Sequence, residues 1–177
     1  TPTFPLNVIN TGGAFDATYG GSNDGFLLKL TNNGNTRIWA TYYGGPSDDH
    51  VNGVVCDAAN NVYITGQTSS ASGVASGGAY QPTRSGSNDA FIAKFNAGGT
   101  NFWSTYYGGS AQEEAFGIAV DPSLNVIITG QTSSVIVMAT TGAHQTALSG
   151  TNDAFIAKFT TTGLRTWSTY YGGTGLE

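Results

Sequence analysis

Two acidic pairs in equivalent positions are the residues of this sequence best suited to bind a cation. Asp48-Asp49 and Glu113-Glu114 each follow a Tyr-Tyr-Gly-Gly segment, at 42–45 and 106–109. Carboxylate oxygens in loops are typical ligands of Ca²⁺, which takes about six to eight oxygen atoms. The alternative is a solvated acidic loop that aids solubility. The pattern therefore predicts either a calcium or cationic-ligand site at Asp48, Asp49, Glu113 and Glu114, or an acidic surface without a ligand.

The sequence offers no convincing arrangement for catalysis. Hydrolysis requires paired carboxylates at a fixed separation or a nucleophile with an oriented base. The two histidines, His50 and His144, occupy unrelated positions in the repeat described below, and the abundant Gly-Gly pairs follow strands instead of forming a phosphate-binding loop. We therefore expect a protein that is not an enzyme.

Three further sets of residues recur and are better explained by structure than by chemistry. Aspartates at strand entries and in turns can accept hydrogen bonds from nearby backbone N–H groups, and tryptophan rings can bury a large area between neighbouring sheets. We expect strand capping by Asp24, Asp89 and Asp153, sheet-to-sheet packing by Trp39, Trp103 and Trp167, and turn capping by Asp57 and Asp121. Metal ligation by the strand-entry aspartates and sugar stacking on the tryptophans are the alternatives.

These residues belong to a unit that repeats along the chain. The three tryptophans lie 64 residues apart (103 − 39 and 167 − 103), and segments 86–109 and 150–173 are identical at most positions. We expect a partial repeat at 1–45, complete repeats at 46–109 and 110–173, and either the start of a further repeat or a tag remnant at 174–177. Units of this kind depend on contacts with their neighbours for stability.

Each complete repeat is expected to form four strands, lettered A to D in chain order. Alternating apolar residues, bounded by turns rich in Asp, Asn, Gly and Ser, are typical of strands. Only the B–C connection is long enough for a helix, and its glycine and serine content (69–87) argues against one. The pattern predicts an all-β fold of β-propeller blades, each a four-stranded antiparallel sheet, with about two and a half blades in an incomplete arc.

The expected strand order also predicts which loops share a face. In an up-and-down sheet the B–C and D–A loops emerge together, opposite the A–B and C–D turns. The long B–C loops and the acidic D–A loops are therefore expected to converge. This face is the candidate site for a carbohydrate or Ca²⁺.

Several segments together resemble the bacterial seven-bladed β-propeller repeat family, SBBP. They are Gly117–Asp121 and Asn125–Gly130, their counterparts Gly53–Asp57 and Asn61–Gly66, the Asn-Asp-Ala-Phe-Ile-Ala-Lys-Phe strand and the Trp-Ser-Thr-Tyr-Tyr-Gly-Gly strand. The A–B turns depart from the family, because Asn60 and Leu124 stand where it usually has glycine. The resemblance implies a propeller from a secreted or cell-surface bacterial protein, commonly without known catalysis.

Composition narrows the possible partners. The formal net charge is −5 with only 6 Lys and Arg residues, too few to neutralise a phosphate backbone, so nucleic-acid binding is not expected. No apolar run approaches the roughly 18 residues that span a bilayer, which argues against membrane insertion. The single cysteine, Cys56, is expected in the apolar core, since its counterpart in the next repeat is Val120.

The ends of the arc and one loop are the expected interaction surfaces. Unpaired blade faces and strand edges invite association, so the expected partners are other blades of the same parent polypeptide or neighbouring subunits. The apolar run Val135, Ile136, Val137 and Met138, in the second B–C loop, is expected either to pack on its own blade or to contact a partner. The leading function is a non-enzymatic structural, adhesion or assembly module, secreted or at the cell surface. Glycan or calcium binding is the alternative.

Overall fold

The computed structural model describes residues 14–135 and 138–175 of the chain, and this part is all-β. Its strands form one two-stranded and two four-stranded antiparallel sheets, in the orders β1-β2, β3-β4-β5-β6 and β7-β8-β9-β10. The strands are β1 (Gly25–Leu30), β2 (Arg37–Tyr43), β3 (Asp49–Cys56), β4 (Val62–Thr68), β5 (Asp89–Phe95), β6 (Asn101–Tyr107), β7 (Glu113–Val120), β8 (Val126–Thr132), β9 (Asp153–Phe159) and β10 (Arg165–Tyr171). No described segment is a helix of the length and apolarity needed to cross a bilayer.

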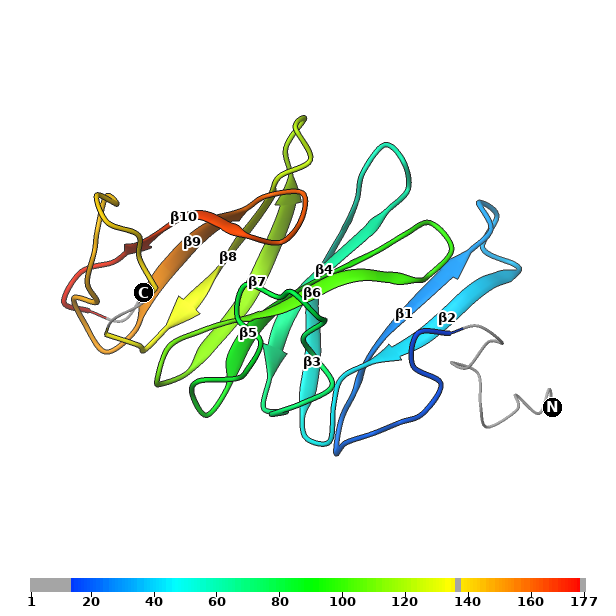
Figure 1. The fold of residues 1–177 in the computed structure, drawn as a ribbon, viewed down its shortest axis with the longest axis horizontal. Coiled ribbons are helices and arrows are strands. Elements are labelled where there is room, and N and C mark those ends of the chain that lie inside the picture. Colours follow the sequence, from blue (N-terminus) through cyan, green and yellow to red (C-terminus); the bar gives the residue numbers. More distant parts are fainter. Residues whose placement is uncertain (1–13, 136–137, 176–177) are drawn as a thin grey trace.

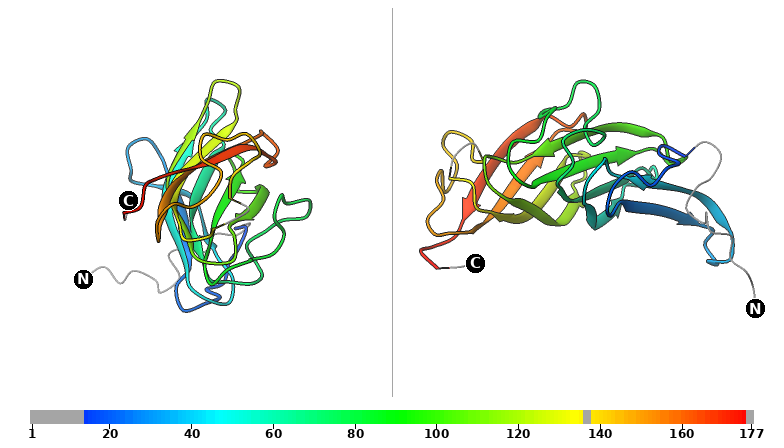
Figure 2. Two further views of the ribbon diagram at one scale, coloured as in Figure 1. Left: turned by 90° about the vertical axis from the view of Figure 1, so that its left-hand side faces the viewer. Right: turned by 90° about the horizontal axis from the view of Figure 1, so that it is seen from below.

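The three sheets stand side by side in a curved row, with β1-β2 at one end and β9-β10 at the other (Figures 1 and 2). The second and third sheets each hold strands A to D of one repeat, in chain order. The first sheet holds strands C and D alone. The prediction of partial and complete propeller blades in an open arc is confirmed, and we call the sheets the half-blade, the first full blade and the second full blade.

Two layers of apolar side chains hold the blades together. One lies between the half-blade and the first full blade and contains Leu27, Tyr43, Phe91 and Phe95, all at most 6% exposed. The other lies between the two full blades and contains Tyr107, Phe155 and Phe159, all at most 1% exposed. Successive side chains of a strand point to opposite faces, so strand C of the first full blade contributes Phe91 to one layer and Ile92 to the other. Among the described residues, the first full blade therefore packs against another blade on both of its faces, whereas the second full blade does so on one face.

One residue in each A–B turn has a left-handed backbone conformation, which glycine adopts most readily. Asn60 and Leu124 are the only described non-glycine residues with a positive φ, 60° and 63°. Their N–H groups donate to the carbonyls of Asp57 and Asp121, at 2.9 and 2.8 Å. This left-handed conformation costs roughly 1–2 kcal/mol for most residues, but asparagine tolerates it better.

We expect Leu124→Gly to raise the free energy of unfolding by about 0.5–1 kcal/mol, because relief of the left-handed strain exceeds the added flexibility of the unfolded chain. Asn60→Gly should leave stability nearly unchanged. Urea titration of the two variants measures the difference. A loss of stability in Leu124→Gly would contradict this account of the turn.

Cys56 is not in the core, contrary to the sequence-based prediction. It is the last residue of β3 and is exposed. Its repeat counterpart Val120 is partly buried and packs between the two full blades. The same face of β3 points toward the half-blade, whose described residues include no strand A or B, and Cys56 is therefore exposed.

Candidate functional site

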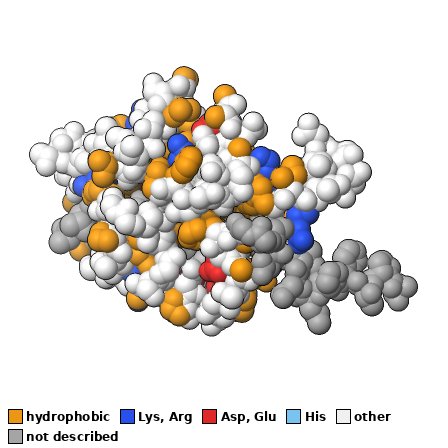
Figure 3. Space-filling view, turned by 45° about the vertical axis from the view of Figure 1, so that its right-hand side comes forward, with side chains coloured by type: hydrophobic (Ala, Val, Ile, Leu, Met, Phe, Trp, Pro, Cys, Tyr) orange, Lys and Arg blue, Asp and Glu red, His pale blue; other side chains and the backbone are white. Residues whose placement is uncertain are grey.

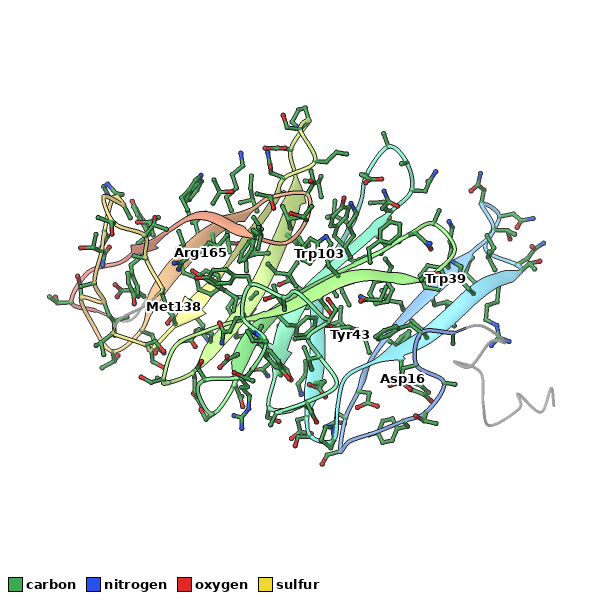
Figure 4. The ribbon with its side chains drawn as sticks, in the orientation of Figure 1. Asp16, Trp39, Tyr43, Trp103, Met138 and Arg165 are labelled. Atoms are coloured by element: carbon green, nitrogen blue, oxygen red, sulfur yellow. The ribbon has the colours of Figure 1, made fainter. Side chains whose placement is uncertain are left out.

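A tryptophan-to-turn contact joins each blade to the next. The Trp39 indole, on strand D of the half-blade, donates from Nε1 to the carbonyl oxygen of Ala97 at 3.0 Å, in the C–D turn of the first full blade. A Cβ built on Gly99 of that turn would lie 2.9 Å from the Trp39 ring. Only glycine allows the turn to lie this close to the indole. Figure 4 shows Trp39 beside the β5–β6 turn.

The contact repeats between the two full blades. Trp103 donates from Nε1 to the carbonyl oxygen of Thr161 at 3.0 Å, and a Cβ on Gly163 would lie 2.6 Å from the Trp103 ring. The third member of the series, Trp167, is 40% exposed. The structure therefore uses two of the three tryptophans to hold neighbouring blades and leaves the third on an end face.

Tyrosine hydroxyls on the same strands add a second contact to each junction. Tyr43 donates to the carbonyl oxygen of Val74 at 2.9 Å, and Tyr107 donates to that of Met138 at 2.7 Å. Both acceptors lie in the B–C loop of the next blade. Burial raises the pKa of both hydroxyls, so they stay protonated donors. Tyr171, the counterpart on the end face, is 63% exposed.

The structure places the two acids of each pair in different environments. Asp49 and Glu113 are the first residues of β3 and β7 and are only 2% and 1% exposed, so they are not part of solvated loops. Asp49 accepts hydrogen bonds from the Gly45 N–H and the Ser70 hydroxyl, both at 2.7 Å. Glu113 accepts from the Gly109 N–H and the Thr132 hydroxyl, both at 2.7 Å. Each carboxylate thus links the D–A connection to the end of strand B or to the residues just after it.

The other acid of each pair, Asp48 or Glu114, is more exposed than Asp49 or Glu113. Asp48 is exposed and accepts a hydrogen bond from the Asn23 amide at 2.9 Å. Glu114 is partly buried and accepts from the Asn52 amide at 3.1 Å, across the junction of the two full blades. Among residues 14–135 and 138–175, no group of three or more His, Cys, Asp or Glu side chains could hold a metal ion.

The strand-entry aspartates bind their own loops. Asp89 Oδ2 accepts from the Ser85 N–H at 2.9 Å and from the Gln81 amide at 2.7 Å. Asp153 Oδ2 repeats this with the Ser149 N–H and Gln145 amide, at 3.0 and 2.6 Å. Asp24 accepts from the Gly20 N–H at 2.5 Å. Each aspartate thus fixes the end of a B–C loop where strand C begins.

Paired carboxylates result from this arrangement. A Cβ on Gly108 would lie 2.6 Å from atoms of both Asp89 and Glu113, and a Cβ on Gly44 would lie within 2.8 Å of both Asp24 and Asp49. Burial raises the pKa values of Asp89 and Glu113, and the negative charge of Asp89 raises that of Glu113 further. One member of such a pair resists ionisation while the other is charged.

This pairing predicts a pH dependence of stability. The folded protein holds protons on Asp89 and Glu113 more tightly than the unfolded chain does, so their contribution is fully present below the ordinary carboxyl range, near pH 4, and is lost as the pH rises through the raised pKa values. Glu113→Gln should therefore gain stability relative to the parent protein as the pH rises from 4 to 7.

Asp121→Asn provides the opposite control. A hydrogen bond and ion pair with Lys158, at 2.7 Å, lower the Asp121 pKa, so its contribution is present above the ordinary carboxyl range and is lost as the pH falls. The stability deficit of Asp121→Asn should shrink on acidification. Urea titrations at several pH values measure both trends. A Glu113→Gln advantage that instead grows on acidification would contradict the pairing.

The turn aspartates accept backbone hydrogen bonds. Asp57 Oδ1 accepts from the N–H groups of Ala59 and Asn61, both at 2.9 Å. Asp121 Oδ1 accepts from those of Ser123 and Asn125, both at 2.9 Å. Each carboxylate holds an A–B turn closed.

The described residues of the apolar run in the second B–C loop differ in their exposure to solvent. Met138 is 1% exposed and belongs to the core between the full blades, so it packs within the chain. Val135 is 57% exposed. Ile136 and Val137 lie outside the described residues.

The two ends of the arc expose opposite halves of one junction. The second full blade exposes Phe116, Trp167 and Tyr171, at 50%, 40% and 63%. The half-blade exposes Phe26 and Leu30, at 55% and 41%, whose counterparts Phe91 and Phe95 are fully buried. Gly34, the counterpart of Gly99, has no atom within 4 Å of a built Cβ. The repeat spacing predicts the tryptophan series from the sequence, but it does not predict the burial of Asp49 and Glu113. The available signal is that each lies four residues after a Gly-Gly pair.

These sheets and junctions define a propeller-type repeat protein. Residues 38–73 match the family model described as the SBBP beta-propeller repeat. The matched segment covers strand D of the half-blade and strands A and B of the first full blade. The resemblance inferred from the sequence is thus confirmed for this segment. No curated protein matches the chain.

Proposed function

We propose that this chain is a non-enzymatic propeller module that acts in structure, adhesion or assembly, in the extracellular space or at the cell surface. The observation that carries the proposal is the pair of complementary end faces. Each end face exposes side chains whose counterparts in another repeat are buried between blades. A surface of this kind is suited to receive another blade, whether from the same parent polypeptide or from a neighbouring subunit. The extracellular location is supported by the family resemblance alone.

Adding a repeat tests this proposal. A second copy of residues 110–173 is fused directly after Gly173, so that its C–D turn can reach Trp167. Since a repeat array gains stability from each neighbouring interface, the fusion should unfold in one transition at a higher temperature, with blue-shifted tryptophan fluorescence.

The matched control carries Gly163→Lys in the added copy only. A side chain there would collide with the indole, as the 2.6 Å distance to the Trp103 ring indicates, so the gain should disappear. If the added repeat melts separately and leaves the original transition unchanged, the end face is not an assembly surface.

The second candidate is a ligand-binding face for carbohydrate or Ca²⁺. A polar cleft lies between the two full blades on the side of the D–A and B–C loops. Its lining is rich in amides and carboxylates: Gln67, Asn88, Gln112, Glu113, Glu114, Gln131, Ser133 and Asn152. Such groups can hydrogen-bond to sugar hydroxyls or contribute oxygen ligands. Calorimetry with Ca²⁺ and with a glycan panel separates this candidate from the first, and Glu114→Gln should abolish any heat that arises from this cleft.

A further inference from the structure

An apolar groove runs between the half-blade and the first full blade. It is lined by Leu27, Leu28, Lys29, Leu30, Trp39, Val54, Cys56, Asn60 and Val62. Leu28, Leu30 and Val54 are 46%, 41% and 62% exposed, although they lie on strands of the sheets. Figure 3, in which this end of the molecule comes forward, shows hydrophobic side chains on the surface with few charges among them.

One wall of the groove is an edge of β1 that pairs with no other strand among residues 14–135 and 138–175. The equivalent strands β5 and β9 are paired on both sides, with β4 and β6 and with β8 and β10. Within the described part of the chain, β1 pairs only with β2. Its other edge therefore presents backbone N–H and C=O groups in the same places where β9 binds β8, over the full register from Val126↔Phe159 to Thr132↔Asp153.

The other wall is the face of β3 that meets a strand A elsewhere. At the next junction the counterparts of Val54 and Cys56 are Ile118 and Val120, which pack into the core between the full blades together with Val55 of the preceding strand A. The groove thus has the two contacts that an A–B hairpin makes: an edge for strand B and an apolar wall beside strand A.

We propose that this groove and the free edge of β1 bind a β-hairpin of the β7–β8 type, donated by another repeat chain. The inference rests on the proposed function, since it names the element that the module takes up at its half-blade end. In the register of the internal blades, Val126 of the hairpin lies opposite Leu30, and Ile128 lies opposite Leu28. Edge pairing of this kind supplies backbone hydrogen bonds, while alternate side chains fill pockets.

Charge complementarity supports this occupant. In the second full blade, Lys158 of strand C forms an ion pair at 2.7 Å with Asp121 in the A–B turn. The counterpart of Lys158 is Lys29, which lines the groove. Its ammonium group donates to the carbonyl oxygen of Ala97 at 2.9 Å. A hairpin that carries Asp121 places a carboxylate beside Lys29.

A synthetic peptide of residues 110–134 tests the proposal on the intact chain, with the Cys56 thiol as reporter. The peptide contains no cysteine, so the reaction of the protein with a disulfide reagent reports Cys56 alone. Saturating peptide should slow this reaction at least tenfold, and the melting temperature of the chain should rise by several degrees.

Two controls make the result specific. A peptide with Ile127→Asp, whose altered side chain would face Val62 in the groove, should give no protection. Val54→Asp in the chain should abolish protection by the parent peptide, whereas Val135→Asp, at a position 57% exposed outside the groove, should leave it intact. Protection that survives Val54→Asp, or an unchanged thiol rate at millimolar peptide, would overturn the proposal. The added-repeat experiment at the opposite end is independent of this outcome, so the proposed function can stand if the hairpin does not bind.

Discussion

Trp103→Ala is expected to lower the free energy of unfolding by about 3 kcal/mol, within the range for removing a large aromatic side chain from a packed site. The indole lies over Gly163 of the next blade and donates to Thr161 at 3.0 Å. Its loss removes the packing of a partly buried ring between the full blades. It also removes one hydrogen bond, which is worth about 1 kcal/mol. Chemical denaturation followed by circular dichroism measures the change.

Trp167→Ala is the matched control, because the same residue type stands at the same repeat position with no following blade among the described residues. Its side chain is already 40% exposed, so we expect a loss below about 1 kcal/mol. Equal losses in the two variants would show that the tryptophans stabilise their own sheets and not the junctions.

Gly66→Ala is expected to prevent folding or to destabilise the protein by more than about 3 kcal/mol, because overpacking against backbone cannot be relieved by side-chain rotation. A Cβ at Gly66 would lie 1.8 Å from the carbonyl oxygen of His50. The cause is the bulge in β3, where the register shifts between Val51 and Gly53 opposite this glycine. Thermal unfolding and the yield of soluble protein measure the effect.

Gly77→Ala isolates the steric cause. No atom lies within 4 Å of a Cβ built on Gly77, and its φ is not in the left-handed region. Stability should be unchanged or slightly higher, since alanine reduces the freedom of the unfolded chain. A folded Gly66→Ala variant with stability close to that of Gly77→Ala would contradict the bulge geometry.

The strands, their order and the junction tryptophans could be predicted because the repeat presents each feature more than once. The alternation from Asp89 to Phe95 gives a strand, and Trp39 and Trp103 at one repeat spacing indicate one structural role. Asn60 and Leu124 likewise occupy equivalent positions of the repeat and share a left-handed backbone conformation.

The environment of individual side chains could not be predicted in the same way. Asp49 and Glu113 look like loop acids because their charge is evident in the sequence. The groups that bind them are not evident, since the hydroxyls of Ser70 and Thr132 lie about 20 residues later, at the end of strand B or just after it. Cys56 looks like a core residue because its counterpart is Val120. Its exposure depends on which neighbouring strands are present, and that information lies outside the local sequence.

The account depends on each tryptophan lying over a glycine of the following blade, and proton chemical shifts of three equivalent glycines test this directly. An aromatic ring shifts protons above its face upfield. The Hα signals of Gly99 and Gly163 should therefore be shifted strongly upfield and show nuclear Overhauser effects to Trp39 and Trp103, respectively, whereas those of Gly34 should lie at ordinary values. Ordinary shifts at all three glycines would contradict the junctions and the blade arrangement built on them.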